Sequence, residues 1–219
     1  MKKLILAGAV AAMLSACAGV GGMLGGGNPQ ITALSAKSTE LTFDVAISLD
    51  ASAQSYVAVL DAVGNKTEAE RIKAETANLR DEKDKDKLEA AMGMLNEVDI
   101  TKELEAAEDL SDEGKAKITD AILNLGIAIF YDGKAGLDAK NLVTEAKDVA
   151  SNLSASDALA VGEVNNIVTN ASWVADMAPS QLELQKKSFE GLKAYASTHG
   201  IEIPSQEEIQ KKAESIGRE

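Results

Sequence analysis

A long stripe of apolar and small residues at helical spacing is the feature that most constrains the fold of this chain. The stripe recurs at steps of four and three residues, through Val45, Leu49, Ser52, Tyr56, Val59 and Val63. Residues with these spacings share one face of an α-helix. The pattern predicts one long helix that ends at Gly64, because a glycine followed by an asparagine is typical of a helix C-terminus.

The rest of the chain repeats this helical pattern, and no segment alternates polar and apolar residues as a half-buried strand does. The most apolar segment has on one face Ile118, Ala121, Ile122, Leu125 and Ile129. We expect this helix at the centre of the protein, with Gly126 marking a close crossing by a neighbour. Turns are expected at residues 132–136 and at Pro179, and capping boxes predict helix starts at Ser180 and Ser205.

These patterns predict an all-α fold, an elongated antiparallel bundle of about six or seven helices. Aromatic residues make up only 3% of the chain. The core must therefore be built from Ala, Leu, Ile, Val and Met, which favour closely packed helices. Residues 31–219 are assigned to a single domain, since no linker interrupts them and about 190 residues bury a sizeable core.

The chain opens with two lysines and an apolar stretch that ends in Leu14-Ser15-Ala16-Cys17. These are the parts of a bacterial export signal, and the stretch is too short to span a bilayer. Its last four residues resemble the lipobox of bacterial lipoproteins at every position. The resemblance implies that residues 1–16 are a signal peptide that is removed. It also implies that Cys17 carries acyl chains such as palmitate and that the glycine-rich residues 17–30 form a flexible tether.

Two alternatives for Cys17 stay open at this point. Ala16-Cys17-Ala18 also fits an ordinary signal-peptidase site, and cleavage there would release a soluble periplasmic protein. Cys17 could also be a plain apolar residue of the signal. Ala18, where aspartate would mark inner-membrane retention, resembles the sorting signal of outer-membrane lipoproteins. We expect a protein anchored to the bacterial outer membrane, facing either the periplasm or the cell surface.

Composition limits the chemistry that the domain can perform. Removing Lys2 and Lys3 changes the formal net charge from −13 to −15, which opposes binding to nucleic acid. A lipidated Cys17 leaves no thiol for a disulfide, and the single histidine, His199, excludes a histidine-rich metal site. No nucleophile motif or phosphate-binding glycine loop is present. We therefore predict no catalytic residues, metal or cofactor, and a protein that is not an enzyme.

One polar helix face is a candidate for binding a ligand or partner. At helical spacing it carries Glu163, Asn166, Asn170, Trp173 and Met177. An aromatic platform beside amides suits recognition. The simpler interpretation is that the amides are solvated and Trp173 packs at the edge of the core. The charged run at residues 80–87 is interpreted as a solvated helix face, because Leu88 and Glu89 occupy positions that a calcium loop reserves for a ligand and a glycine.

The leading hypothesis is a membrane-anchored, non-enzymatic lipoprotein that acts in binding, scaffolding or envelope assembly. It would contact the membrane through its N-terminal lipid and a protein partner in the cell envelope. The first alternative is a membrane-active or pore-forming helical protein. Its difficulty is that the uncharged stretch from Ala121 to Tyr131 has 11 residues, whereas a spanning helix needs about 17 to 25. The second alternative is an enzyme whose active site carries no recognisable motif.

Overall fold

The computed structural model describes residues 28–107, 110–153 and 158–217. Within these residues every regular element is a helix and none is a strand. The predicted all-α class is confirmed. Cys17 and the glycine-rich residues up to Gly27 lie outside the described residues.

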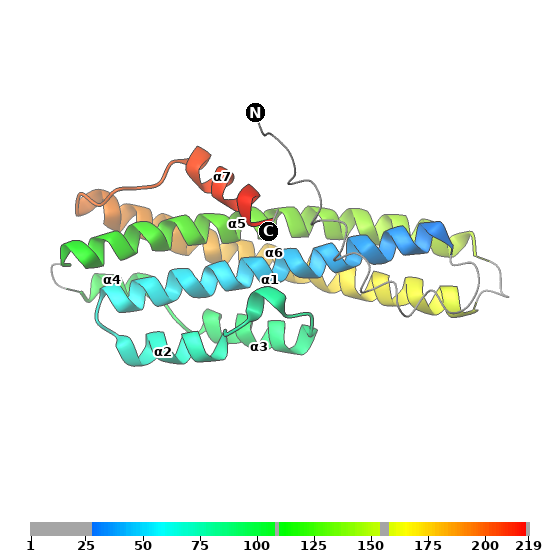
Figure 1. Cartoon of the computed structure of the whole chain (residues 1–219), viewed down its shortest axis with the longest axis horizontal. Helices are drawn as coiled ribbons and strands as arrows, with labels where there is room; N and C mark the ends of the chain where they lie inside the picture. The colour runs from blue at the N-terminus through cyan, green and yellow to red at the C-terminus, as the bar shows by residue number, and fades with distance from the viewer. Residues whose placement is uncertain (1–27, 108–109, 154–157, 218–219) are drawn as a thin grey trace, which may run out of the picture.

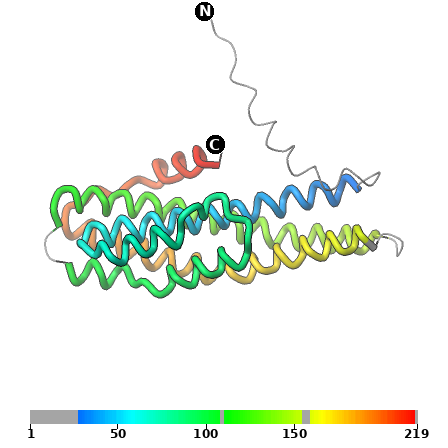
Figure 2. The backbone as a smooth tube through the Cα atoms, turned by 60° about the horizontal axis from the view of Figure 1, so that its bottom comes forward, coloured from blue at the N-terminus to red at the C-terminus, as the bar shows by residue number. Residues whose placement is uncertain are grey.

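Three long helices form the body of the molecule: α1 (Pro29–Ala62), α5 (Asp112–Ser151) and α6 (Ala158–Thr198). Figures 1 and 2 show them lying alongside one another, with α1 and α6 running in one direction and α5 in the other. At 1.5 Å per residue, the 40 residues of α5 extend about 60 Å. The described molecule is consequently elongated.

Shorter helices thicken one half of this body. After α1 come α2 (Lys66–Glu75), the 3₁₀ turn η1 (Leu79–Asp81), α3 (Lys85–Asn96) and α4 (Ile100–Glu105), and α7 (Gln206–Ile216) follows α6. The helices α2, η1, α3 and α4 pack on α1, and α7 packs on α5 (Figure 1). All of them lie toward the half where α1 ends and α5 begins. The opposite half is formed by the three long helices.

Local signals fix several helix ends. At the end of α1, Gly64 has a φ of +83°, and the N–H of Asn65 donates to the carbonyl of Leu60. The predicted helix end at Gly64 is confirmed. Ser205 and Glu208 form the predicted capping box at the start of α7. Because both signals depend only on neighbouring residues, the sequence was sufficient to predict them.

The expected turn at residues 132–136 is wrong, since α5 continues without a break. Asp132 and Ala135 are 2% and 0% exposed, so packing against the other long helices holds the segment in place. The lack of a side chain at Gly136 allows α6 to come close, because a Cβ there would lie 3.2 Å from Cβ of Ala178. The glycine is used for helix contact rather than for a turn.

The expected helix end at Pro179 is also wrong, because α6 passes through it. A proline inside a helix removes one backbone hydrogen bond and costs about 3 kcal/mol. Ala178 and Gln181, on either side, are buried at 2% and 5% exposure, and their packing keeps the helix continuous. Ser180 donates to the carbonyl of Met177 and does not start a new helix.

The charged run at residues 80–87 is not the solvated helix that the sequence suggested. It contains η1, a connection and the first turn of α3. The Glu82 carboxylate accepts from the N–H groups of Lys83 and Asp84, and Asp84 then accepts from the N–H of Asp86 to cap α3. Acidic side chains that bond to nearby backbone donors break the helix here.

The core is built from small aliphatic residues, as the composition predicts. In α5, Ile118, Ala121, Ile122 and Leu125 are each 0% exposed. Their burial confirms the central position expected for this segment. The neighbour that approaches Gly126 is Ile209 of α7. Among the residues that the model describes, no helix combines the length and the apolar character needed to cross a bilayer.

The contact at Gly126 gives a stability prediction. A Cβ at this position would lie 2.8 Å from both Cδ1 and Cγ2 of Ile209, so the Ile209 side chain or α7 must shift to accept it. We expect Gly126→Ala to lower the free energy of unfolding by about 1–3 kcal/mol, measured by urea denaturation, and to speed amide exchange in α7. Gly133, which has no atom within 4 Å of such a Cβ, is the matched control. There, alanine should stabilise α5 by up to about 1 kcal/mol. Equal effects at the two glycines would contradict this account.

Candidate functional site: a groove between α3 and α6

A groove of about 680 Å³ separates the first turns of α3 from the middle of α6. We call it the α3–α6 groove. Its lining residues are Lys85, Glu89, Met92, Val168, Thr169, Ser172, Trp173, Asp176 and Met177. Further along both helices, the side-chain amide of Gln181 donates to Asn96 at 3.3 Å and links α6 to the end of α3. The groove therefore lies on the N-terminal side of this link on both helices.

The start of α3 positions the basic residue of the groove. Capping by Asp84 begins α3 at Lys85, whose Nζ lies 5.3 Å from the centroid of the Trp173 ring. The same Nζ lies 3.5 Å from a carboxylate oxygen of Glu89. A cation over an exposed indole ring contributes about 0.5–1 kcal/mol. Lys85 is thus held loosely over Trp173 and can be displaced by another cation or by a partner surface.

The floor of the groove is apolar and adaptable. Met177 is 9% exposed, and Met92 and Trp173 are partly buried against the core. Methionine side chains adjust their shape readily, and tryptophan offers a large contact area with a polar N–H. Glu89 and Asp176 place negative charge around this floor. The arrangement suits a protein segment that combines an apolar anchor with basic side chains.

The structure divides the polar face predicted from the sequence. Trp173 and Met177 line the α3–α6 groove, whereas Glu163, Asn166 and Asn170 are exposed on α6 outside its lining. Glu163 accepts a hydrogen bond from Ser35 of α1 at 2.8 Å. A helix-face pattern can group only residues of one helix. Of the five residues that it grouped on α6, two line the groove.

Sequence reasoning missed the α3 side of the groove. Lys85, Glu89 and Met92 are brought to the same groove as Trp173 by the path of the chain between two distant helices, and no local pattern encodes that path. His199, in contrast, lies where the sequence placed it, directly after α6. Its ring stacks on Tyr195 at 4.0 Å between centroids, and Nδ1 is 2.8 Å from the Tyr195 carbonyl.

A second polar group, the Asp132 cluster, lies inside the molecule where the three long helices meet. It consists of Ser48 and Ser52 from α1, Asp132 from α5 and Gln185 from α6. The Gln185 amide donates to both serine hydroxyls at 3.1 Å, and Ser48 donates to the carbonyl of Ala128. The cluster ties the three helices together through hydrogen bonds in the core.

Burial and two unpaired acceptor oxygens in the Asp132 cluster favour a protonated carboxyl group. Oδ2 of Asp132 and Oε1 of Gln185 are both buried and have no donor among the described residues. Burial raises the pKa of Asp132 to about 7, although the neighbouring Ser48 and Gln185 side chains lower it. A proton on Asp132 supplies the donor that two buried acceptor oxygens lack.

An ion pair lies one helical turn away from this cluster. Lys134 Nζ is 2.8 Å from Asp44, which is buried, and 2.9 Å from Glu40, which is exposed. Burial raises the pKa of Asp44 to about 6 against the effect of Lys134. Partial burial lowers the pKa of Lys134, but its hydrogen bonds with Asp44 and Glu40 raise it further than burial lowers it. At neutral pH the Asp44 carboxylate and the Lys134 ammonium group are therefore both charged.

Among the described residues, no group of three or more His, Cys, Asp or Glu side chains is arranged to hold a metal ion. Comparison of the chain with protein-family models, curated proteins and solved structures found no match. The functional argument therefore depends on the residues themselves.

The Asp132 cluster predicts a pH-dependent stability. The ordinary pKa of 3.8 applies to the unfolded chain, and the folded value is about 7. Between these values the folded state holds a proton that the unfolded state has released, so stability falls as pH rises from about 4 to 7. The stability lost over this pH range is on the order of 4 kcal/mol.

We expect Asp132→Asn to remove this contribution. Urea denaturation at pH 4.5 and pH 8 should show the variant gaining stability relative to the wild type as pH rises. Asp148→Asn, at an exposed position on the same helix, is the control and should leave the pH profile nearly unchanged. A difference between wild type and Asp132→Asn that is constant with pH would show that Asp132 is not protonated in the folded state.

Proposed function

We propose that this chain is a lipid-anchored, non-enzymatic binding protein of the bacterial outer membrane, which uses the α3–α6 groove to hold a protein partner in the cell envelope. The observation that carries the proposal is the partly exposed Trp173, which lines the groove together with Met92 and Met177 and has Lys85 over its ring. The elongated antiparallel bundle of α1, α5 and α6 serves as the scaffold. Cys17 is the proposed lipid attachment point.

The groove has the composition of a protein-binding surface. Tryptophan is enriched among the residues that dominate binding energies, and methionine is enriched at interface cores. The acidic groups Glu89 and Asp176 favour a partner segment with basic residues. Displacing Lys85 from Trp173 costs little, because a cation–π contact at an exposed site is weak.

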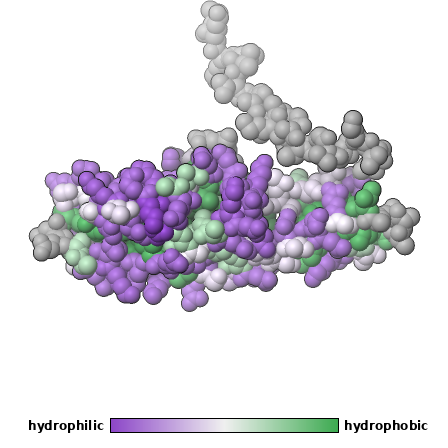
Figure 3. Space-filling model, turned by 90° about the horizontal axis from the view of Figure 1, so that it is seen from below, coloured by the Kyte–Doolittle hydropathy of each residue, from purple (hydrophilic) through white to green (hydrophobic). Residues whose placement is uncertain are grey.

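The position of the first helix supports the membrane anchor. The described chain begins at Asn28, 11 residues after Cys17. A glycine-rich tether of that length has a typical reach of about 20 Å, so the bundle would stay near the membrane surface. Leu159 is 83% exposed near the start of α6, the end of the bundle where α1 also begins. Figure 3 shows hydrophobic residues at this end of a mostly hydrophilic face.

Lipid attachment is tested by metabolic labelling. Radiolabelled palmitate should enter the full chain expressed in a Gram-negative host and should not enter Cys17→Ala. Cys17→Ala should also move from the membrane fraction to the soluble fraction on cell lysis. Ser15→Thr, which keeps the cysteine, is a control that should retain the label. Equal labelling of wild type and Cys17→Ala would reject the lipoprotein assignment.

Partner binding is tested by site-specific photocrosslinking in intact cells. A photoreactive side chain in place of Glu89, in the groove, should give a discrete adduct. The same side chain in place of Glu70, exposed on α2, should not. The adduct should weaken at least fivefold in Asp176→Lys, which places positive charge in the groove against a basic partner segment.

Direct binding can then be measured with the protein identified in the adduct. The chain has a single tryptophan, so its fluorescence reports on the groove alone. The purified partner should shift the emission of Trp173 to shorter wavelength as the indole becomes buried. Identical adducts from positions 89 and 70, or an unchanged emission spectrum, would count against the groove as the binding surface.

A further inference from the structure

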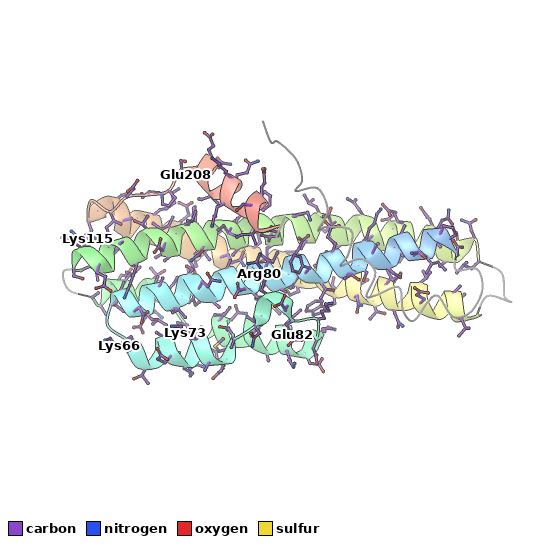
Figure 4. All side chains as sticks on the ribbon, in the orientation of Figure 1. Lys66, Lys73, Arg80, Glu82, Lys115 and Glu208 are labelled. Carbon is purple, nitrogen blue, oxygen red and sulfur yellow. The ribbon has the colours of Figure 1, made fainter. Side chains whose placement is uncertain are left out.

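A second groove crosses the outward face of α1. It has a volume of about 440 Å³, with α1 as its floor and with walls from the end of α2 and the first turns of α5. We call it the Asp50 groove. In Figure 4, α1 passes between α2, where Lys73 is labelled, and the start of α5, where Lys115 is labelled. This volume lies within the range of small-molecule sites.

The groove has acidic and basic residues in its lining: Asp50, Asp61 and Asp120 are acidic, and Lys73 and Lys117 are basic. Gly114 of α5 lies against the carbonyl of Ala62, and Ser48 bonds to the carbonyl of Ala128, which together fix the antiparallel register of α1 and α5. In this register Lys117 lies level with about residue 59 of α1. Asp50 is nine residues away along α1, or about 14 Å. Asp50 and Lys117, which both line the groove, are thus separated by about 14 Å between their backbone positions along the α1 axis.

The charges of Asp50 and Lys117 are weakly engaged within the protein. Asp50 accepts one hydrogen bond, from Gln54 at 2.7 Å. Burial raises the pKa of Asp50, with Gln54 and the more distant Arg80 lowering it, so a further cationic partner would stabilise its charged form. Lys117 pairs at 3.2 Å with Glu113, whose side chain is 81% exposed. Exposed pairs of this kind contribute little to stability and give way readily to a ligand.

The floor and one wall suit a peptide backbone. Ala53, Val57 and Ala58 leave a shallow apolar surface, which accepts small side chains. Asn78, which also lines the groove, has a φ of +69° and is the described non-glycine residue with a left-handed backbone. Amide side chains such as Asn78 and Asn124 can both donate to and accept from peptide groups.

We propose that the Asp50 groove binds a short zwitterionic peptide, with its amino terminus at Asp50 and its carboxylate at Lys117. An extended tetrapeptide spans about 13–14 Å, which is close to the separation of the backbone positions of Asp50 and Lys117 along the α1 axis. The site is separate from the α3–α6 groove and does not depend on the proposed lipid anchor. Asp61, on the floor near Lys117, weakens binding because it repels the ligand carboxylate.

The test uses the full chain and tetra-alanine with free termini, titrated by isothermal calorimetry at pH 7. Tetra-alanine should bind, and acetylation of its amino terminus or amidation of its carboxyl terminus should each weaken binding at least tenfold. Asp50→Asn should weaken binding of the free peptide about tenfold and leave binding of the acetylated peptide unchanged. Lys117→Gln should weaken binding of the free peptide about tenfold and leave binding of the amidated peptide unchanged.

Asp61→Asn provides the decisive control, because it removes the same charge from the same helix as Asp50→Asn. Asp61→Asn should strengthen binding of tetra-alanine about threefold. A general change in electrostatic potential would instead change the affinity of the Asp50 and Asp61 variants in the same direction. Asp176→Asn, in the α3–α6 groove, should leave the affinity unchanged. The proposal is overturned if tetra-alanine fails to bind, if capping its termini has no effect, or if the Asp50 and Asp61 variants change affinity in the same direction.

Discussion

Close contact between the long helices is the constraint on which the rest of this structure depends. The hydroxyl of Ser48 in α1 reaches a backbone carbonyl of α5 at 3.0 Å, and Gly136 of α5 leaves room for Ala178 of α6. Such distances require small side chains at the crossing points. A chain with few aromatic residues meets this requirement, and its stability then comes from many aliphatic contacts distributed over a long interface.

The same close contact explains why polar groups remain in the core. At the Asp132 cluster the helices are near enough for Gln185 to bond to Ser48 and Ser52, and Lys134 reaches Asp44 one turn away. Hydrogen bonds need fixed geometry, whereas aliphatic contacts tolerate sliding. Polar groups at a helix crossing therefore favour one register of α1, α5 and α6 over alternatives displaced by a turn.

The sequence predicted features that neighbouring residues determine, and failed where distant packing decides. The stripe from Val45 to Val63, the stop at Gly64 and the capping box at Ser205 follow local rules. Pro179 is a strong local signal for a helix end, yet packing of α6 overrides it. Trp173 was a candidate from its own helix, but Lys85 and Glu89 reach it through the tertiary fold. Asp132 was assigned to a turn, where an acidic side chain is usually solvated, so no local signal pointed to its burial.

The uneven thickness of the molecule has a mechanical consequence. The short helices and the two grooves lie away from the first turns of α1, where the three long helices stand by themselves (Figure 1). With the chain attached through Cys17 as proposed, this slender end acts as a stalk and the broader part as a head. Because helices resist bending, the stalk would hold the head at a fixed distance from the end of the bundle where α1 begins.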